Sequence, residues 1–93
     1  MPTTITQVED PARGKTILHV SGSMTFDDAV FLEKIALEMR ANLGKNLTID
    51  LADLHFLDSD SAPVIRRLES EHGFEIEGLM IFLQKIVEET ENI

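Results

Sequence analysis

The chain has 93 residues, 43% of them hydrophobic and 27% charged, which is the composition of one soluble globular domain rather than of a disordered chain. A net charge of −9 argues against binding to nucleic acid, because phosphate contacts need clustered Lys and Arg. No apolar run approaches the roughly 18 residues of a membrane span, and the lack of cysteine excludes disulfides and a thiolate nucleophile. We therefore expect a single cytoplasmic domain over residues 1–93, without membrane insertion.

The first two strands are predicted to form a hairpin. Residues 3–9 are rich in β-branched side chains and alternate roughly in polarity, and residues 15–21 form a second strand after a turn that contains Pro and Gly. We expect Gly22 and Ser23 to break this second strand.

Residues 26–43 predict a long helix, which Thr25 and Asp28 would begin as a capping box. Its expected core positions recur at steps of three and four residues: Ala29, Leu32, Ile35, Ala36, Met39 and Leu43. Four more apolar residues lie beside this stripe: Phe26, Val30, Phe31 and Leu37. They indicate either a contact surface or a broad helix face packed under a neighbouring element.

The stretch from residue 46 to residue 62 joins a buried strand to a polar turn and then to a helix. Alternate positions in the strand are apolar: Leu47, Ile49 and Leu51. A second apolar trio is expected to anchor the connection that follows: Leu54, Phe56 and Leu57. The four small polar residues 58–61 then stand where a helix needs partners for its free N–H groups.

The rest of the chain predicts a helix, a strand and another helix. The second helix places three residues inward: Val64, Ile65 and Leu68. A short strand over residues 74–77 follows, and a last helix over residues 79–90 has apolar residues on more than one face. The order is β-β-α-β-α-β-α, so the fold class is α/β with a small, mixed and mostly parallel sheet.

No reacting group of side chains can be assembled from the sequence. A serine nucleophile needs a base, and His19, His55 and His72 stand singly with no pattern that links them to Ser59. A calcium loop opening at Asp58 is excluded, because its sixth position, which requires glycine, is Pro63. We expect no enzymatic activity, metal or cofactor.

The motif LDSDS, ending at Ser61, follows an apolar strand and leads into a helix, and upstream the chain reads ILHVSGSMTFDDA from Ile17. These segments resemble the STAS domains of anti-sigma factor antagonists. The resemblance implies a small sheet with its helices packed largely on one face. It also implies that Ser59 is phosphorylated by a partner serine kinase that is itself the anti-sigma factor.

The chain departs from the family pattern next to Ser59. Asp60 stands where the family usually has Ser or Thr, and Ser61 stands where it usually has Gly. Pro63 belongs in the first helical turn, so we expect the helix to start at about Asp60 or Ser61 and Ser59 to lie in the loop.

Two roles for Ser59 follow from these observations: a helix N-cap, or a regulatory site at which a phosphoryl group of about −1.5 to −2 charges blocks docking. The predicted partner-binding residues are Met24, Phe26, Asp58, Asp60 and Ser61. The expected partners are an anti-sigma kinase or other STAS-domain proteins.

Two alternative functions remain open. One is a scaffold that associates with itself as a homodimer, or with other STAS modules, through its surplus apolar surface. The other is a cytoplasmic STAS domain linked to a sulphate-type anion transporter.

Overall fold

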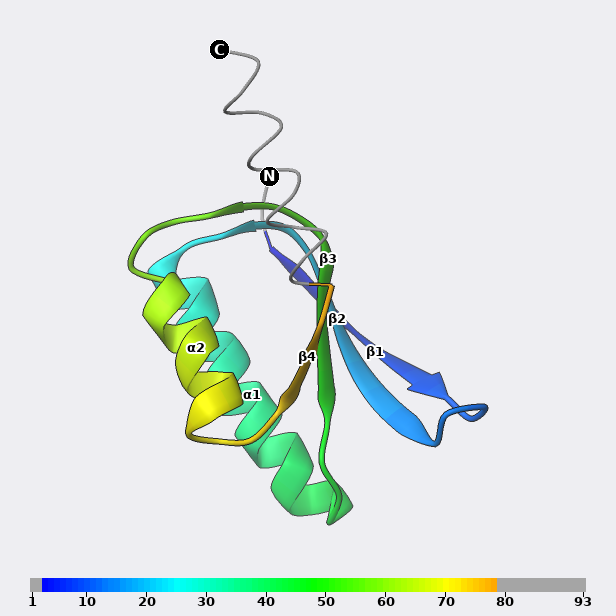
Figure 1. The fold of residues 1–93 in the computed structure, drawn as a ribbon. Helices are drawn as coiled ribbons and strands as arrows, with labels where there is room; N and C mark the ends of the chain where they lie inside the picture. The colour runs from blue at the N-terminus through cyan, green and yellow to red at the C-terminus, as the bar shows by residue number, and fades with distance from the viewer. Residues whose placement is uncertain (1–2, 79–93) are drawn as a thin grey trace.

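A computed structural model describes residues 3–78 of the chain as one sheet with two helices on one face (Figure 1). The elements in chain order are β1 (Thr4–Asp10), β2 (Lys15–Met24), α1 (Phe26–Leu43), β3 (Thr48–Leu57), α2 (Ala62–Ser70) and β4 (Glu75–Glu77). The predicted last helix over residues 79–90 lies outside the described residues.

The sheet has the strand order β1-β2-β3-β4. Strands β1 and β2 form the predicted antiparallel hairpin, while β2 with β3 and β3 with β4 are parallel. Each parallel pair is joined through a helix, which is how parallel strands must be connected. The expected α/β class, with a mixed and mostly parallel sheet, is confirmed.

The core lies between the sheet and the two helices. Strands β2 and β3 contribute Leu18, Val20, Met24, Ile49, Leu51 and Leu54, and the helices contribute Ala29, Leu32, Ala36, Val64, Ile65 and Leu68. Leu18, Val20 and Ile49, Leu51 stand at alternate strand positions, and the step of three from Leu51 to Leu54 coincides with a register shift between β2 and β3. The helix residues fall on one side of each helix, so one face of each element is buried. The inward residues predicted for α2 are confirmed.

Strand β2 does not end at Gly22 and Ser23, contrary to the sequence prediction. It continues to Met24, with a shift of register against β3 between Gly22 and Ser23. Gly22 has a φ of +90°, which a residue without a Cβ adopts readily, so the glycine bends the strand without ending it.

Strand β3 is also longer than predicted. The trio of Leu54, Phe56 and Leu57 belongs to the strand and not to a connection after it. Leu54 is buried, but Phe56 is 52% exposed, so the prediction that Phe56 anchors this segment is wrong.

Helix α1 has the predicted bounds. Leu43 was expected in the core stripe but is 45% exposed, and it is the last residue of the helix. Of the apolar residues beside the stripe, Phe26, Val30 and Phe31 are exposed, whereas Leu37 is packed against the core. A contact surface on α1 therefore remains open as an interpretation.

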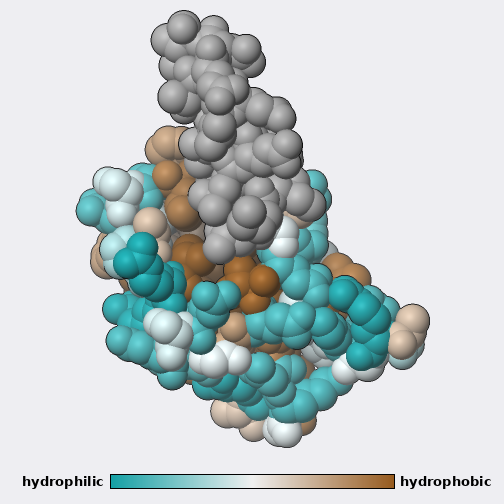
Figure 2. All heavy atoms as spheres, in the orientation of Figure 1, coloured by the Kyte–Doolittle hydropathy of each residue, from teal (hydrophilic) through white to brown (hydrophobic). Residues whose placement is uncertain are grey.

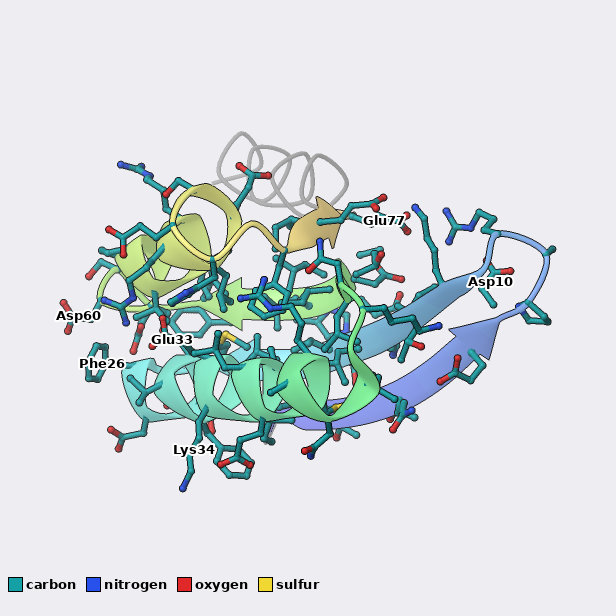
Figure 3. All side chains as sticks on the ribbon, turned by 90° about the horizontal axis from the view of Figure 1, so that it is seen from below. Asp10, Phe26, Glu33, Lys34, Asp60 and Glu77 are labelled. Carbon is teal, nitrogen blue, oxygen red and sulfur yellow. The ribbon has the colours of Figure 1, made fainter. Side chains whose placement is uncertain are left out.

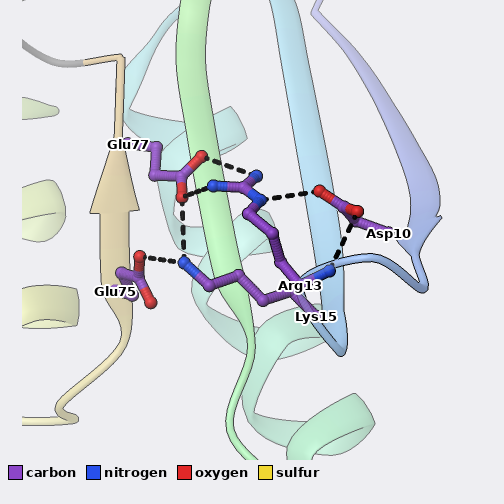
Figure 4. A network of polar contacts seen from close by, with 5 residues as sticks. All are labelled: Asp10, Arg13, Lys15, Glu75 and Glu77. Atoms are coloured by element: carbon purple, nitrogen blue, oxygen red, sulfur yellow. Dashed lines mark hydrogen bonds and ion pairs between the residues drawn. The ribbon is translucent and has the colours of Figure 1, made fainter.

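The sheet face without helices carries a network of charged side chains (Figure 4). Arg13, in the hairpin turn, contacts Asp10 at 2.6 Å and Glu77 of β4 at 2.9 Å. Lys15 of β2 contacts Glu75 at 2.5 Å and Glu77 at 3.1 Å. These contacts reach across β3 and connect the hairpin with β4.

Candidate partner-docking corner

The two helices of the described chain begin at the same corner of the molecule. Strand β2 ends at Met24 and passes into α1 at Phe26, while β3 ends at Leu57 and reaches α2 at Ala62 after a short turn (Figure 1). The two strands are still paired at this end, where Met24 lies opposite Leu57. The Asp58 N–H also donates to the Met24 carbonyl at 3.1 Å.

Asp58 binds both helix starts at once. Its Oδ2 atom accepts a hydrogen bond from the Phe26 N–H at 3.1 Å, at the start of α1. Its Oδ1 atom accepts one from the Ser61 N–H at 2.9 Å and another from the Ser61 hydroxyl. The hydroxyl contact is the main reason that the pKa of Asp58 is lowered. Asp58 therefore acts first as a clamp within the fold, as expected of a polar residue ahead of a helix, and it also binds the start of α1, which the sequence did not indicate.

Ser61 is fully buried and stands at the N-cap position of α2. Its hydroxyl is used by Asp58, so the prediction that Ser61 contacts a partner is wrong. A buried serine is tolerated at this position because its hydroxyl has a partner inside the fold.

Met24 is also fully buried, so it is a core residue and not an exposed docking residue. Because β2 does not end before it, Met24 shares its side of the strand with Leu18 and Val20. The error follows directly from ending the strand too early.

Ser59 lies in the turn, exposed, two residues before the N-cap of α2. The loop position is as predicted, and Ser61 at the N-cap contradicts the alternative in which Ser59 caps the helix. Helix α2 starts at Ala62, a residue later than expected, with Pro63 in its first turn. Within the described residues the Ser59 hydroxyl makes no hydrogen bond, so folding does not occupy this group.

A groove of about 360 Å³ opens beside the turn, between the starts of the two helices. Its lining residues are Phe26, Asp60, Pro63, Val64 and Arg67. Figure 3 shows Phe26 and Asp60 at the same end of the molecule. Phe26 and Asp60 were predicted from the sequence, whereas the α2 side of the groove was not, because a proline and a valine after a cap indicate only the start of a helix.

The charge of Arg67 in this groove is compensated by α1. Its guanidinium contacts the Glu33 carboxylate at 2.6 and 2.8 Å, and Glu33 also contacts His72 at 3.1 Å. Arg67 is the main cause of the lowered pKa of Glu33. Asp60 lines the groove, and Asp27 follows Phe26 in the first turn of α1; neither has an ion pair in the described part of the chain, so both add negative charge to this corner.

The histidines do not complete a reactive site with Ser59. His19 contacts Asp53 at 2.6 Å, and His72 contacts Glu33. Among residues 3–78, no group of three or more His, Asp and Glu side chains is arranged to hold a metal ion. No helix in the same part of the chain is long and apolar enough to cross a membrane.

No protein-family model matches the sequence, and no curated protein matches it significantly. Solved structures do match. The antisigma-factor antagonist STAS domain from Rhodobacter sphaeroides superposes with a TM-score of 0.59 at 16% identity, and the match covers 89% of this chain and 94% of that one.

Two further structures are similar over smaller shares. An uncharacterized protein of the DUF3478 family from Shewanella loihica PV-4, with a SpoIIAA-like fold, has a TM-score of 0.51 at 19% identity, covering 80% of this chain and 61% of that one. The crystal structure of Mglu has a TM-score of 0.50 at 22% identity, covering 68% of this chain and 16% of that one. The chain thus spans less than two thirds of both of these proteins. At these identities the similarity establishes the architecture, and the chain has the STAS, or SpoIIAA-like, fold.

Proposed function

We propose that this chain is a non-enzymatic regulatory domain that binds another protein, as anti-sigma factor antagonists do, and that phosphorylation of Ser59 by a partner serine kinase controls this binding. The observation that carries the proposal is the exposed Ser59 hydroxyl, free of hydrogen bonds to residues 3–78, on the strand-to-helix turn of a STAS fold.

The charges around Ser59 give phosphorylation a large effect. A phosphoryl group adds about −1.5 to −2 charges at neutral pH. It would stand between Asp58, which keeps its own charge through the bonds to Ser61 and Phe26, and the exposed Asp60. The added repulsion and the bound water of the phosphate would both oppose docking at the corner.

The docking surface supported by the geometry is the groove with its rim, not the set predicted from sequence. Phe26 is 47% exposed and supplies apolar area beside Val64, while Asp60 and Asp27 give the rim a negative charge. A partner segment that combines an apolar side chain with Lys or Arg fits this surface. An overall charge of −9 favours the same kind of partner.

A scaffold function, in which the domain associates without phosphorylation, is a second candidate. The exposed apolar residues Phe26, Val30 and Phe31 on α1 favour it, since such residues often mark contact surfaces.

The test is incubation of the purified chain with ATP and each candidate anti-sigma kinase of its genome, followed by mass spectrometry of the peptide that contains Ser59. We expect label on Ser59 with at least one kinase and none on the Ser59→Ala variant. The matched control is Ser70→Ala, another exposed serine, whose hydroxyl bonds to the Arg66 carbonyl. Label only at other positions, or with no kinase, would overturn control through Ser59.

A further inference from the structure

We propose that the β1 edge of the sheet is a homodimer interface, at which β1 pairs antiparallel with β1 of a second copy. This inference does not depend on Ser59, because β1 and β4 are the two sheet edges and the docking corner lies between the helix starts.

The two edges differ in how they are protected. Exposed edges invite pairing with other chains, and charged side chains normally prevent it. Strand β4 carries Glu75 and Glu77, whereas residues 4–8 of β1 contain no charge and no proline. Val8 on this edge is exposed, and within the described residues β1 pairs only with β2. An edge with these properties is suited to adding a strand.

A groove of about 390 Å³ runs beside the same edge, between β1 and α1. Most of its lining is apolar, from Ile5, Leu18, Phe31, Ile35 and Met39, and Thr3, Gln7 and Asp28 complete it. Phe31 is 57% exposed, the largest fraction among the exposed large hydrophobic residues of the described chain. A strand added at β1 would bring a second α1 toward this groove, so edge and groove would be covered together. In the view of Figure 2, most of the described surface is hydrophilic.

A second copy fits the edge better than an unrelated strand, because β1 is complementary to itself. Centring an antiparallel pair on Thr6, the middle of the uncharged stretch, places Ile5 opposite Gln7 of the second copy and Thr4 opposite its Val8. Glu9 then faces Thr3. Within this strand pair no like charges meet, although each copy carries −9, and the uncharged stretch of the edge is where two acidic copies can approach.

The expected distance between the α1 helices of the two copies also fits the size of the side chains on α1. A two-fold axis perpendicular to the sheet puts both copies of α1 on the same face. Strands lie about 4.8 Å apart, so helices packed over β2 of each copy would be about 14 Å apart. Direct helix contact occurs at about 8–10 Å, and the remaining space needs large side chains. Phe31 and Ile35 of both copies would fill it.

Disulfide trapping tests the pairing and its register, because the chain contains no cysteine of its own. In Thr6→Cys, the two sulfurs would face each other across the axis at a Cα separation of about 4.5–5.5 Å, which a disulfide spans. In Thr4→Cys, the two cysteines would be offset by four residues along the strand, about 13 Å, and should not join. We expect the oxidised dimer to form at least about tenfold faster in Thr6→Cys. Equal rates for the two variants would overturn the register.

Mass measurement by light scattering or sedimentation, over a concentration series of the full chain, tests the dimer itself. We expect twice the monomer mass of 10.4 kDa at high concentration, a dissociation constant at least about tenfold weaker for Phe31→Glu, and wild-type association for Phe56→Glu. Phe56 is the matched control, because it is similarly exposed and lies on β3, away from the β1 edge. A monomer at all concentrations, or equal loss in both variants, would overturn the proposal. Weaker association of the Ser59→Ala variant would indicate that the interface lies at the docking corner and would overturn the pairing of β1.

Discussion

Asp58 illustrates how one residue can serve the fold at a position where the sequence suggests a partner contact. The motif predicted its location at the turn, and that location is correct. Its bonds to the N–H of Phe26 and of Ser61 are not visible in the sequence, because they depend on two helices starting side by side. Helix starts carry unsatisfied donors, and a carboxylate there is a strong acceptor.

We expect Asp58→Ala to lower the melting temperature, because it removes the side-chain acceptor of the Phe26 N–H and of the Ser61 hydroxyl. The neighbouring Asp60→Ala, at an exposed carboxylate outside this pair of bonds, should leave the melting temperature almost unchanged. Thermal unfolding followed by circular dichroism measures both. A larger loss in Asp60→Ala than in Asp58→Ala would show that the clamp does not stabilise the corner.

At the scale of elements, regular periodicity was the most reliable guide. The bounds of α1 and the buried face of α2 followed from three- and four-residue spacing. The ends of β2 and β3 did not follow from periodicity. A glycine usually indicates a turn, but Gly22 stands at a register shift inside β2. That error placed Met24 on the surface when it is in the core.

The difference between buried and exposed positions on α1 gives an element-scale prediction. Leu32 is fully buried in the core, so Leu32→Ala should lower the free energy of unfolding by about 2–5 kcal/mol. Leu43 is on the same helix but nearly half exposed, so Leu43→Ala should cost less than about 1 kcal/mol. Urea denaturation of the two variants compares them directly, and equal losses would place Leu43 in the core.

At the scale of the whole molecule, the network of Figure 4 makes distant parts of the chain depend on one another. Residues 10–15 reach the β4 residues 75–77 through side chains that cross β3. The sequence contained these charges, but the pairing depends on the strand order, which brings both segments onto one face. The pattern of buried residues predicts the fold but does not identify a partner, because exposed residues such as Ser59 are not constrained by packing.

The network predicts how stability depends on pH. The pKa of Glu77 is lowered mainly by Arg13 and then by Lys15, and the pKa of Asp10 is lowered mainly by Arg13. A carboxyl with a lower pKa in the folded state stabilises the fold above its unfolded pKa, about 4.3 for Glu. That stabilisation is lost as the pH falls from about 5 through the lower folded value. Exposure keeps each contribution small, so the effect should appear as a slope rather than as a sharp transition.

Urea denaturation at a series of pH values from about 7 to about 3 measures this slope through the free energy of unfolding. We expect Glu77→Gln to flatten the fall in stability between about pH 5 and pH 3, because the variant has no carboxyl to protonate at this position. Glu69→Gln, at an exposed α2 position that no ion pair in the described structure includes, is the matched control and should keep the wild-type slope. Equal slopes in wild type and Glu77→Gln would mean that the contacts of Glu77 with Arg13 and Lys15 contribute nothing to acid stability.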